Sequence, residues 1–105
     1  MNLEKLYTML KETGYPVAYS HFQEENPPTL PFITYLDTSE NFGADNRVYH
    51  EITDVSIELY TETKDIEAEN KLQDLLNSND LFWNKTINYI PSEKVFQVTY
   101  EITLI

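Results

Sequence analysis

The chain has no cysteine among its 105 residues, and it has few glycines and few basic side chains. The absence of cysteine excludes disulfides, thiolate metal sites and thiol nucleophiles. Two glycines, Gly14 and Gly43, are too few for a glycine-rich loop that would hold a phosphate. No apolar run approaches the roughly 18 residues of a membrane-spanning helix, and no secretion signal opens the sequence. We therefore expect an intracellular, soluble protein that does not contact membranes.

Negatively charged residues dominate the composition of the chain. Seven Lys and Arg residues stand against eighteen Asp and Glu residues, for a formal net charge of −11. Stable binding to nucleic acid needs clustered basic side chains, so this composition argues against it. Three interpretations stay open: a surface that confers solubility, one that repels DNA, or one that imitates DNA.

Residues that could carry chemistry are sparse. The dipeptide His50-Glu51 begins like a zinc-protease helix motif, but Asp54 occupies the position of the second histidine and the segment has the pattern of a strand. No serine lies in a nucleophile-elbow pattern. The sequence thus predicts no catalytic residues, no metal site and no cofactor, and we expect a protein that is not an enzyme.

The clearest structural pattern lies in residues 48–77. Val55, Ile57 and Leu59 alternate with polar residues, which is typical of a strand with one buried face. Thr63 is the expected N-cap of a following helix. That helix has one apolar stripe, formed by Ala68, Leu72, Leu75 and Leu76.

The remaining pattern predicts another helix and four more strands, which makes five strands in all. Asn2 is positioned to cap the first helix, and Gly14 to follow its end. Strands are predicted at 17–22, 32–37, 47–60, 85–90 and 95–105, and residues 81–83 are expected to pack under the sheet. In the third strand the alternation slips, which indicates either a bulge near Thr53 or an outer half that leaves the sheet to face a partner.

These elements predict a single domain over residues 1–105. Their order is helix, three strands, helix, two strands, and short turns favour antiparallel pairing. The expected fold class is α+β, with one largely antiparallel sheet of about five strands and two helices packed on one face.

One group of residues is a candidate protein interface. It comprises Phe42, Arg47, Tyr49, His50 and Tyr60, from the long polar loop and the third strand. Tyrosine is enriched at interfaces because it is large, stiff and amphipathic. A local hydrophobic cluster remains the alternative.

Three segments resemble a known family. Residues 41–50 (NFGADNRVYH), 57–65 (IELYTETKD) and 92–102 (SEKVFQVTYEI) are similar to small proteins of tailed bacteriophages and prophages of Gram-positive bacteria. That family comprises minor capsid, head–tail connector and tail-completion proteins. The resemblance implies a tail-terminator-like domain in the virion neck, made in the bacterial cytoplasm. It also implies a self-assembled ring, with six copies as one allowed size, that meets tail-tube or head-connector proteins.

The composition is compatible with a ring-forming protein, but it is also compatible with a second function. A closed ring needs two different contact faces on each subunit, and an acidic lining would let DNA pass without holding its phosphates. The alternative is a small acidic inhibitor, a DNA mimic or an immunity-type protein, that binds a basic enzyme.

Overall fold

The computed structural model describes residues 1–23, 28–39 and 52–105 of the chain. Within these ranges it contains two helices and five strands in one sheet, which confirms the predicted α+β class. In chain order the elements are α1 (Leu3–Lys11), β1 (Val17–Tyr19), β2 (Phe32–Asp37), β3 (Thr53–Thr61), α2 (Ile66–Ser78), β4 (Asn84–Ile90) and β5 (Val95–Leu104).

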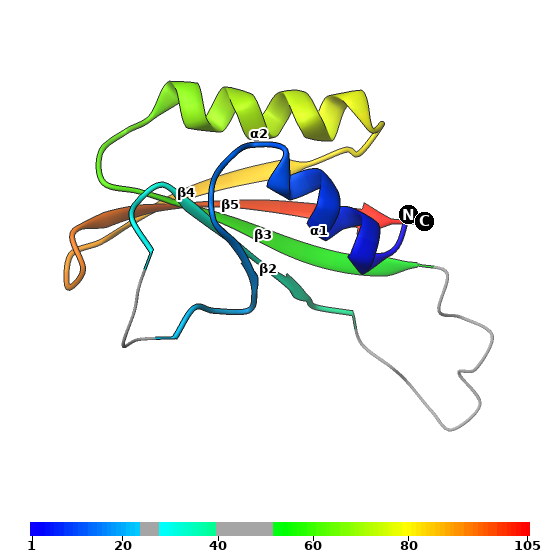
Figure 1. Ribbon diagram of the computed structural model, residues 1–105, viewed down its shortest axis with the longest axis horizontal. Helices are drawn as coiled ribbons and strands as arrows, with labels where there is room; N and C mark the ends of the chain where they lie inside the picture. The colour runs from blue at the N-terminus through cyan, green and yellow to red at the C-terminus, as the bar shows by residue number, and fades with distance from the viewer. Residues whose placement is uncertain (24–27, 40–51) are drawn as a thin grey trace.

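The sheet order differs from the chain order. The strands lie in the order β1-β2-β3-β5-β4, so β5 is inserted between β3 and β4. The pair β1 and β2 is parallel, and the other pairs are antiparallel. Both helices lie on the same face of the sheet, as Figure 1 shows. The opposite face therefore has no helix over it in the described part of the chain.

The core lies between the sheet and the two helices. Predicted strand residues Val55, Ile57 and Leu59 are fully buried, and so is Tyr100 at the centre of β5. The helices cover them with Leu6, Leu10, Leu72 and Leu76, all fully buried. The alternation in β3 and β5 thus identified the buried face of the sheet correctly.

The helix ends confirm two predicted residues and correct a third. Asn2 caps α1, accepting from the Lys5 amide at 2.8 Å, and Gly14 adopts a left-handed φ of +86° after that helix. The expected cap of α2 is wrong. Asp65, immediately before the helix, accepts from the Ala68 amide at 3.0 Å, whereas Thr63 lies two residues earlier and is exposed.

The contribution of the Asp65 cap of α2 to stability can be measured by removing its side chain. We expect Asp65→Ala to lower the free energy of unfolding by about 0.5–2 kcal/mol, because the amides of the first turn lose an acceptor and a favourable charge. Thr63→Ala, the matched control, should change it by less than about 0.5 kcal/mol. Chemical denaturation of both variants checks this, and equal losses would contradict the assignment.

Two further expectations need correction, and a third extends beyond the described residues. β1 ends at Tyr19 rather than at residue 22, since Ser20 takes a left-handed φ of 68°. Leu81 and Trp83 pack against the core, but Phe82 is 94% exposed. β3 pairs with β5 without interruption from Thr53 to Thr61. Residues 47–51 lie outside the described residues, so the choice between a bulge near Thr53 and an outer half that faces a partner stays a prediction.

Candidate protein-interaction surface

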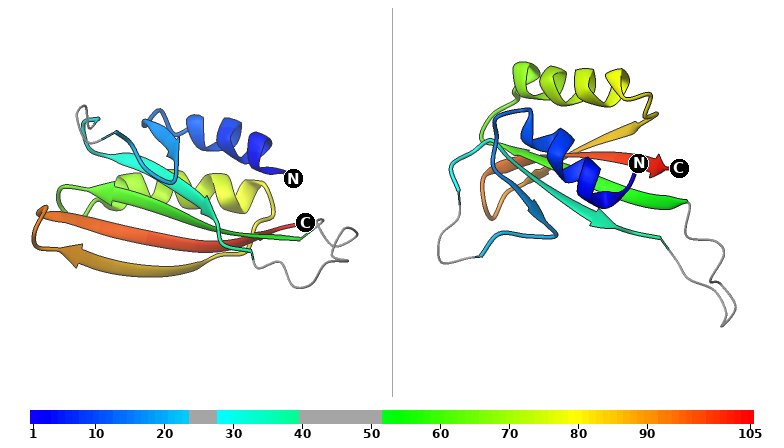
Figure 2. Two further views of the ribbon diagram at one scale, coloured as in Figure 1. Left: turned by 90° about the horizontal axis from the view of Figure 1, so that it is seen from below. Right: turned by 45° about the vertical axis from the view of Figure 1, so that its right-hand side comes forward.

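The face of the sheet away from the helices is the most distinctive surface of the described chain. We call it the open face; Figure 2 shows the two helices on the other side of the sheet. Side chains alternate along a strand, so the residues between the core positions point to this face. On the three central strands they are Phe32, Thr34, Leu36, Asp54, Ser56, Glu58, Tyr60, Gln97, Thr99, Glu101 and Thr103.

A hydrogen-bond network centred on Glu58 orders one end of the open face. Gln97 Nε2 donates to Glu58 Oε2 at 2.8 Å, and Thr34 Oγ1 donates to Glu58 Oε1 at 3.1 Å. Gln97 also donates to the Tyr60 hydroxyl at 2.9 Å, and that hydroxyl lies 3.4 Å from Glu58 Oε2. The network spans β2, β3 and β5, so these side chains are fixed before any partner arrives.

Aromatic rings extend this end of the face. The Tyr60 ring lies 5.0 Å from that of Phe32, which in turn lies 5.2 Å from Phe22. They border a groove of about 500 Å³ that also includes His21 and Glu93. Burial raises the pKa of Tyr60, and the charge of Glu58 adds to the effect. The shift favours the protonated form of the hydroxyl, which a tyrosine already holds at neutral pH.

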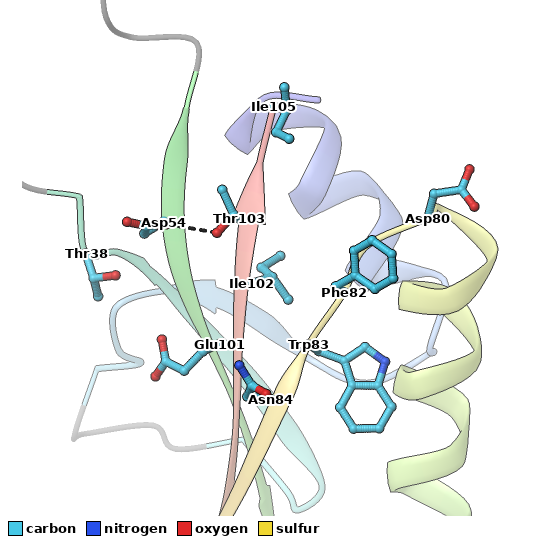
Figure 3. A pocket seen from close by; sticks show the side chains of 10 residues that line it. All are labelled: Thr38, Asp54, Asp80, Phe82, Trp83, Asn84, Glu101, Ile102, Thr103 and Ile105. Carbon is cyan, nitrogen blue, oxygen red and sulfur yellow. Dashed lines mark hydrogen bonds between the residues drawn. The ribbon is translucent and has the colours of Figure 1, made fainter.

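The other end of the face is acidic. Asp54 and Glu101 border a depression of about 620 Å³ that continues around the end of the sheet to Phe82 and Asp80, beyond the end of α2. Figure 3 shows these two pairs on opposite sides of it. Asp54 accepts from Thr103 Oγ1 at 2.9 Å, and Glu101 accepts from Ser56 Oγ at 2.6 Å. Among the described residues that line the depression there is no Lys, Arg or His, and the partners of these two carboxylates there are hydroxyl groups.

The electrostatics of the open face follow from its composition. Strands β2, β3 and β5 contain no Lys or Arg, and Asp54, Glu58 and Glu101 all face the open side. Such a surface repels phosphate and attracts a basic protein surface. Its polar network and aromatic end are suited to protein contact.

Groups that could perform chemistry do not converge in the described ranges. Within residues 1–23, 28–39 and 52–105, no three His, Cys, Asp or Glu side chains gather where they could hold a metal ion. His21 is exposed, and its Nδ1 lies 3.2 Å from the hydroxyl of the neighbouring Ser20. In the same ranges, neither helix has both the length and the apolar character that crossing a membrane requires.

The predicted interface residues are only partly placed. Tyr60 lies on the open face, half-buried, as part of the Glu58 network. Phe42, Arg47, Tyr49 and His50 lie outside the described residues. Sequence reasoning missed Phe32, Glu58 and Gln97. The signal for Glu58 and Gln97 was present, since both occupy the polar positions of alternating strands.

Comparison with known proteins does not assign the chain to a family. The chain matches no protein-family model, and a search of curated proteins finds no similar sequence.

Proposed function

We propose that this chain is a structural, non-catalytic subunit of the neck of a tailed bacteriophage. In this proposal it forms or joins a ring at the head–tail junction or at the end of the tail tube. The observation that carries it is the open face, which no described helix covers. It is ordered by the Glu58 network, aromatic at one end and acidic at the other. The resemblance of the loop and strand segments to phage tail-completion proteins supplies the biological setting.

The chemistry of this face suits an assembly part. A ring subunit needs two unlike contact surfaces, and the aromatic groove around Tyr60 and Phe32 differs in kind from the acidic depression around Asp54 and Glu101. Carboxylates that face a channel would keep DNA from adhering during passage. The partners in this proposal are further copies of the chain and tail-tube or head-connector proteins.

Mass measurement tests the proposal. We expect light scattering to detect a ring when tail-tube protein is present, and assembly to strengthen with salt, since salt screens repulsion between acidic subunits over roughly 8–10 Å. Tyr60→Ala should weaken ring formation about tenfold or more, because tyrosines in packed interfaces often contribute over 1 kcal/mol. Tyr7→Ala, at an exposed tyrosine of α1 on the helix side, is the matched control.

Two readouts separate assembly from folding. Circular dichroism must show Tyr60→Ala to be folded, since its ring packs on Phe32. Tyr60→Phe keeps that ring and removes only the hydroxyl of the Glu58 network, so it should retain most of the assembly. If folded Tyr60→Ala assembled as well as Tyr7→Ala, Tyr60 would not belong to the interface between subunits.

A second candidate function is favoured by the same carboxylates. Asp54, Glu58 and Glu101 present negative charge on one face of the sheet, as a DNA mimic must. An acidic inhibitor would ignore tail components and bind a basic nuclease tightly, with an affinity that falls steeply as salt rises. That outcome would favour the inhibitor function over the proposed ring.

A further inference from the structure

One edge of the sheet lacks the usual protection against pairing. β4 is an outer strand of seven residues, and only β5 pairs with it in the described part of the chain. Figure 2 shows it along the border of the sheet. Its register with β5 is continuous from Asn84 to Ile90, so no bulge bends the edge away. Proteins usually shield such an edge with lysines, proline, a bulge or a very short strand.

The one lysine of β4 does not shield the edge. Lys85 Nζ donates to Glu69 Oε1 at 2.9 Å and to Gln73 Oε1 at 3.1 Å, so it is drawn onto α2. The proline, Pro91, comes after the strand has ended. The opposite edge differs, because β1 has only three residues and ends at the left-handed Ser20.

The charge of β4 identifies what can approach it. The chain carries eighteen acidic residues, yet Asn84–Ile90 contains none of them. A second copy of a chain with charge −11 is repelled over most of its surface, and this edge is a place where two copies can meet without opposing carboxylates. The strand also exposes apolar side chains, since Ile87 is 43% and Tyr89 46% exposed.

We propose that two copies of this chain pair through β4, antiparallel about a two-fold axis at Ile87. Ile87 is the middle residue of Asn84–Ile90, so this register uses all seven positions. It places Ile87 opposite Ile87 of the other copy, Thr86 opposite Asn88, and Lys85 opposite Tyr89. None of these pairs opposes like charges, and the β-branched pair at the centre is favourable in a sheet. The two sheets become one continuous sheet.

This contact goes beyond the proposed ring and does not depend on it. It is centred on Ile87 at the edge of the sheet, whereas the ring contacts use the groove at Tyr60 and the acidic depression, which shares Asn84 with β4. An experiment can therefore contradict the β4 dimer without contradicting the proposed ring, and the reverse also holds. Because a single strand pair makes a small interface, the dimer is expected to be weak and concentration-dependent. Salt should strengthen it by screening the remaining negative charge.

Sedimentation equilibrium on the full chain without tail components tests the pairing. We expect a monomer–dimer equilibrium, and Ile87→Lys should raise the dissociation constant about tenfold or more by placing two ammonium groups opposite each other. Ile87→Thr, β-branched and uncharged, should dimerise nearly as well as the parent chain. Tyr60→Ala should leave the dimer unchanged. A chain that remains monomeric near millimolar concentration, or an unaltered constant for folded Ile87→Lys, would overturn the proposal.

The absence of cysteine allows a geometric test. Ile87→Cys introduces the only thiol, and across the proposed axis it meets its own copy with Cα atoms about 4.5–5.5 Å apart, within the range that a disulfide spans. We expect mild oxidation to convert it into a disulfide-linked dimer at least about tenfold faster than Tyr19→Cys, the matched control at an exposed position of the other edge strand. Equal rates would exclude the register centred on Ile87.

Discussion

Leu72→Ala is expected to lower the free energy of unfolding by about 2–5 kcal/mol, because it leaves a cavity where the neighbours cannot fully collapse. Leu72 is 0% exposed and lies on the face of α2 that covers the sheet. The same hydrophobic core includes Ile57, Leu59 and Tyr100, which belong to the neighbouring strands β3 and β5. A loss of this size is a large share of the roughly 5–15 kcal/mol that stabilises a typical domain.

Urea denaturation measures the loss. Asn70→Ala, at an exposed position of the same helix, is the control, and it should change the free energy of unfolding by no more than about 0.5 kcal/mol. Leu72→Met roughly conserves volume and should cost less than about 1.5 kcal/mol. An unchanged midpoint for Leu72→Ala would mean that α2 does not cover the sheet as described.

The buried half of this fold was predictable from local patterns. Val55, Ile57 and Leu59 alternate with polar residues over a full strand, and Leu72 and Leu76 recur at helical spacing. Both signals depend only on the side-chain period of each element. For the same reason, the class of fold and the buried faces of β3, β5 and α2 were predicted correctly.

Features that depend on contacts distant in sequence were not predictable. Nothing local to residues 17–19 shows that β1 would pair parallel to β2, and nothing local to β5 shows that it would lie between β3 and β4. The cap of α2 was misplaced because Thr63 and Asp65 are both good N-caps, and the backbone decides between them. Of the candidate interface, only Tyr60 falls within the described residues.

One buried acidic residue joins α2 to the edge of the sheet, and its carboxylate stabilises the fold in a pH-dependent way. Glu69 is 3% exposed and accepts from Lys64 and from Lys85, the latter at 2.9 Å. Burial by itself would raise the pKa of the Glu69 carboxyl, but hydrogen bonds and charge from the two lysines outweigh it, and the pKa lies below its usual value. The charged form is therefore favoured in the folded state.

The sign of the pH dependence follows from this shift. Because the pKa of Glu69 is lower in the folded than in the unfolded chain, its contribution is complete above the unfolded value of 4.5. It is lost as pH falls through the folded pKa. We expect Glu69→Gln to reduce the free energy of unfolding at pH 7 by roughly 1–3 kcal/mol, the range for removing one partner of a buried polar interaction. Both lysines are partly exposed and can turn to water, which keeps the loss below that of a fully buried pair.

Measuring stability from pH 7 downward distinguishes a charge effect from a packing effect. The difference between the parent chain and Glu69→Gln should be constant above about pH 5 and shrink at lower pH, as the parent carboxylate takes up a proton. Glu67→Gln, at an exposed acid in the same first turn of α2, should show a much smaller loss at every pH. If the difference for Glu69→Gln persisted undiminished at pH 2, the loss would come from packing of the amide. Glu69 would then fill space between α2 and β4 rather than act through its charge.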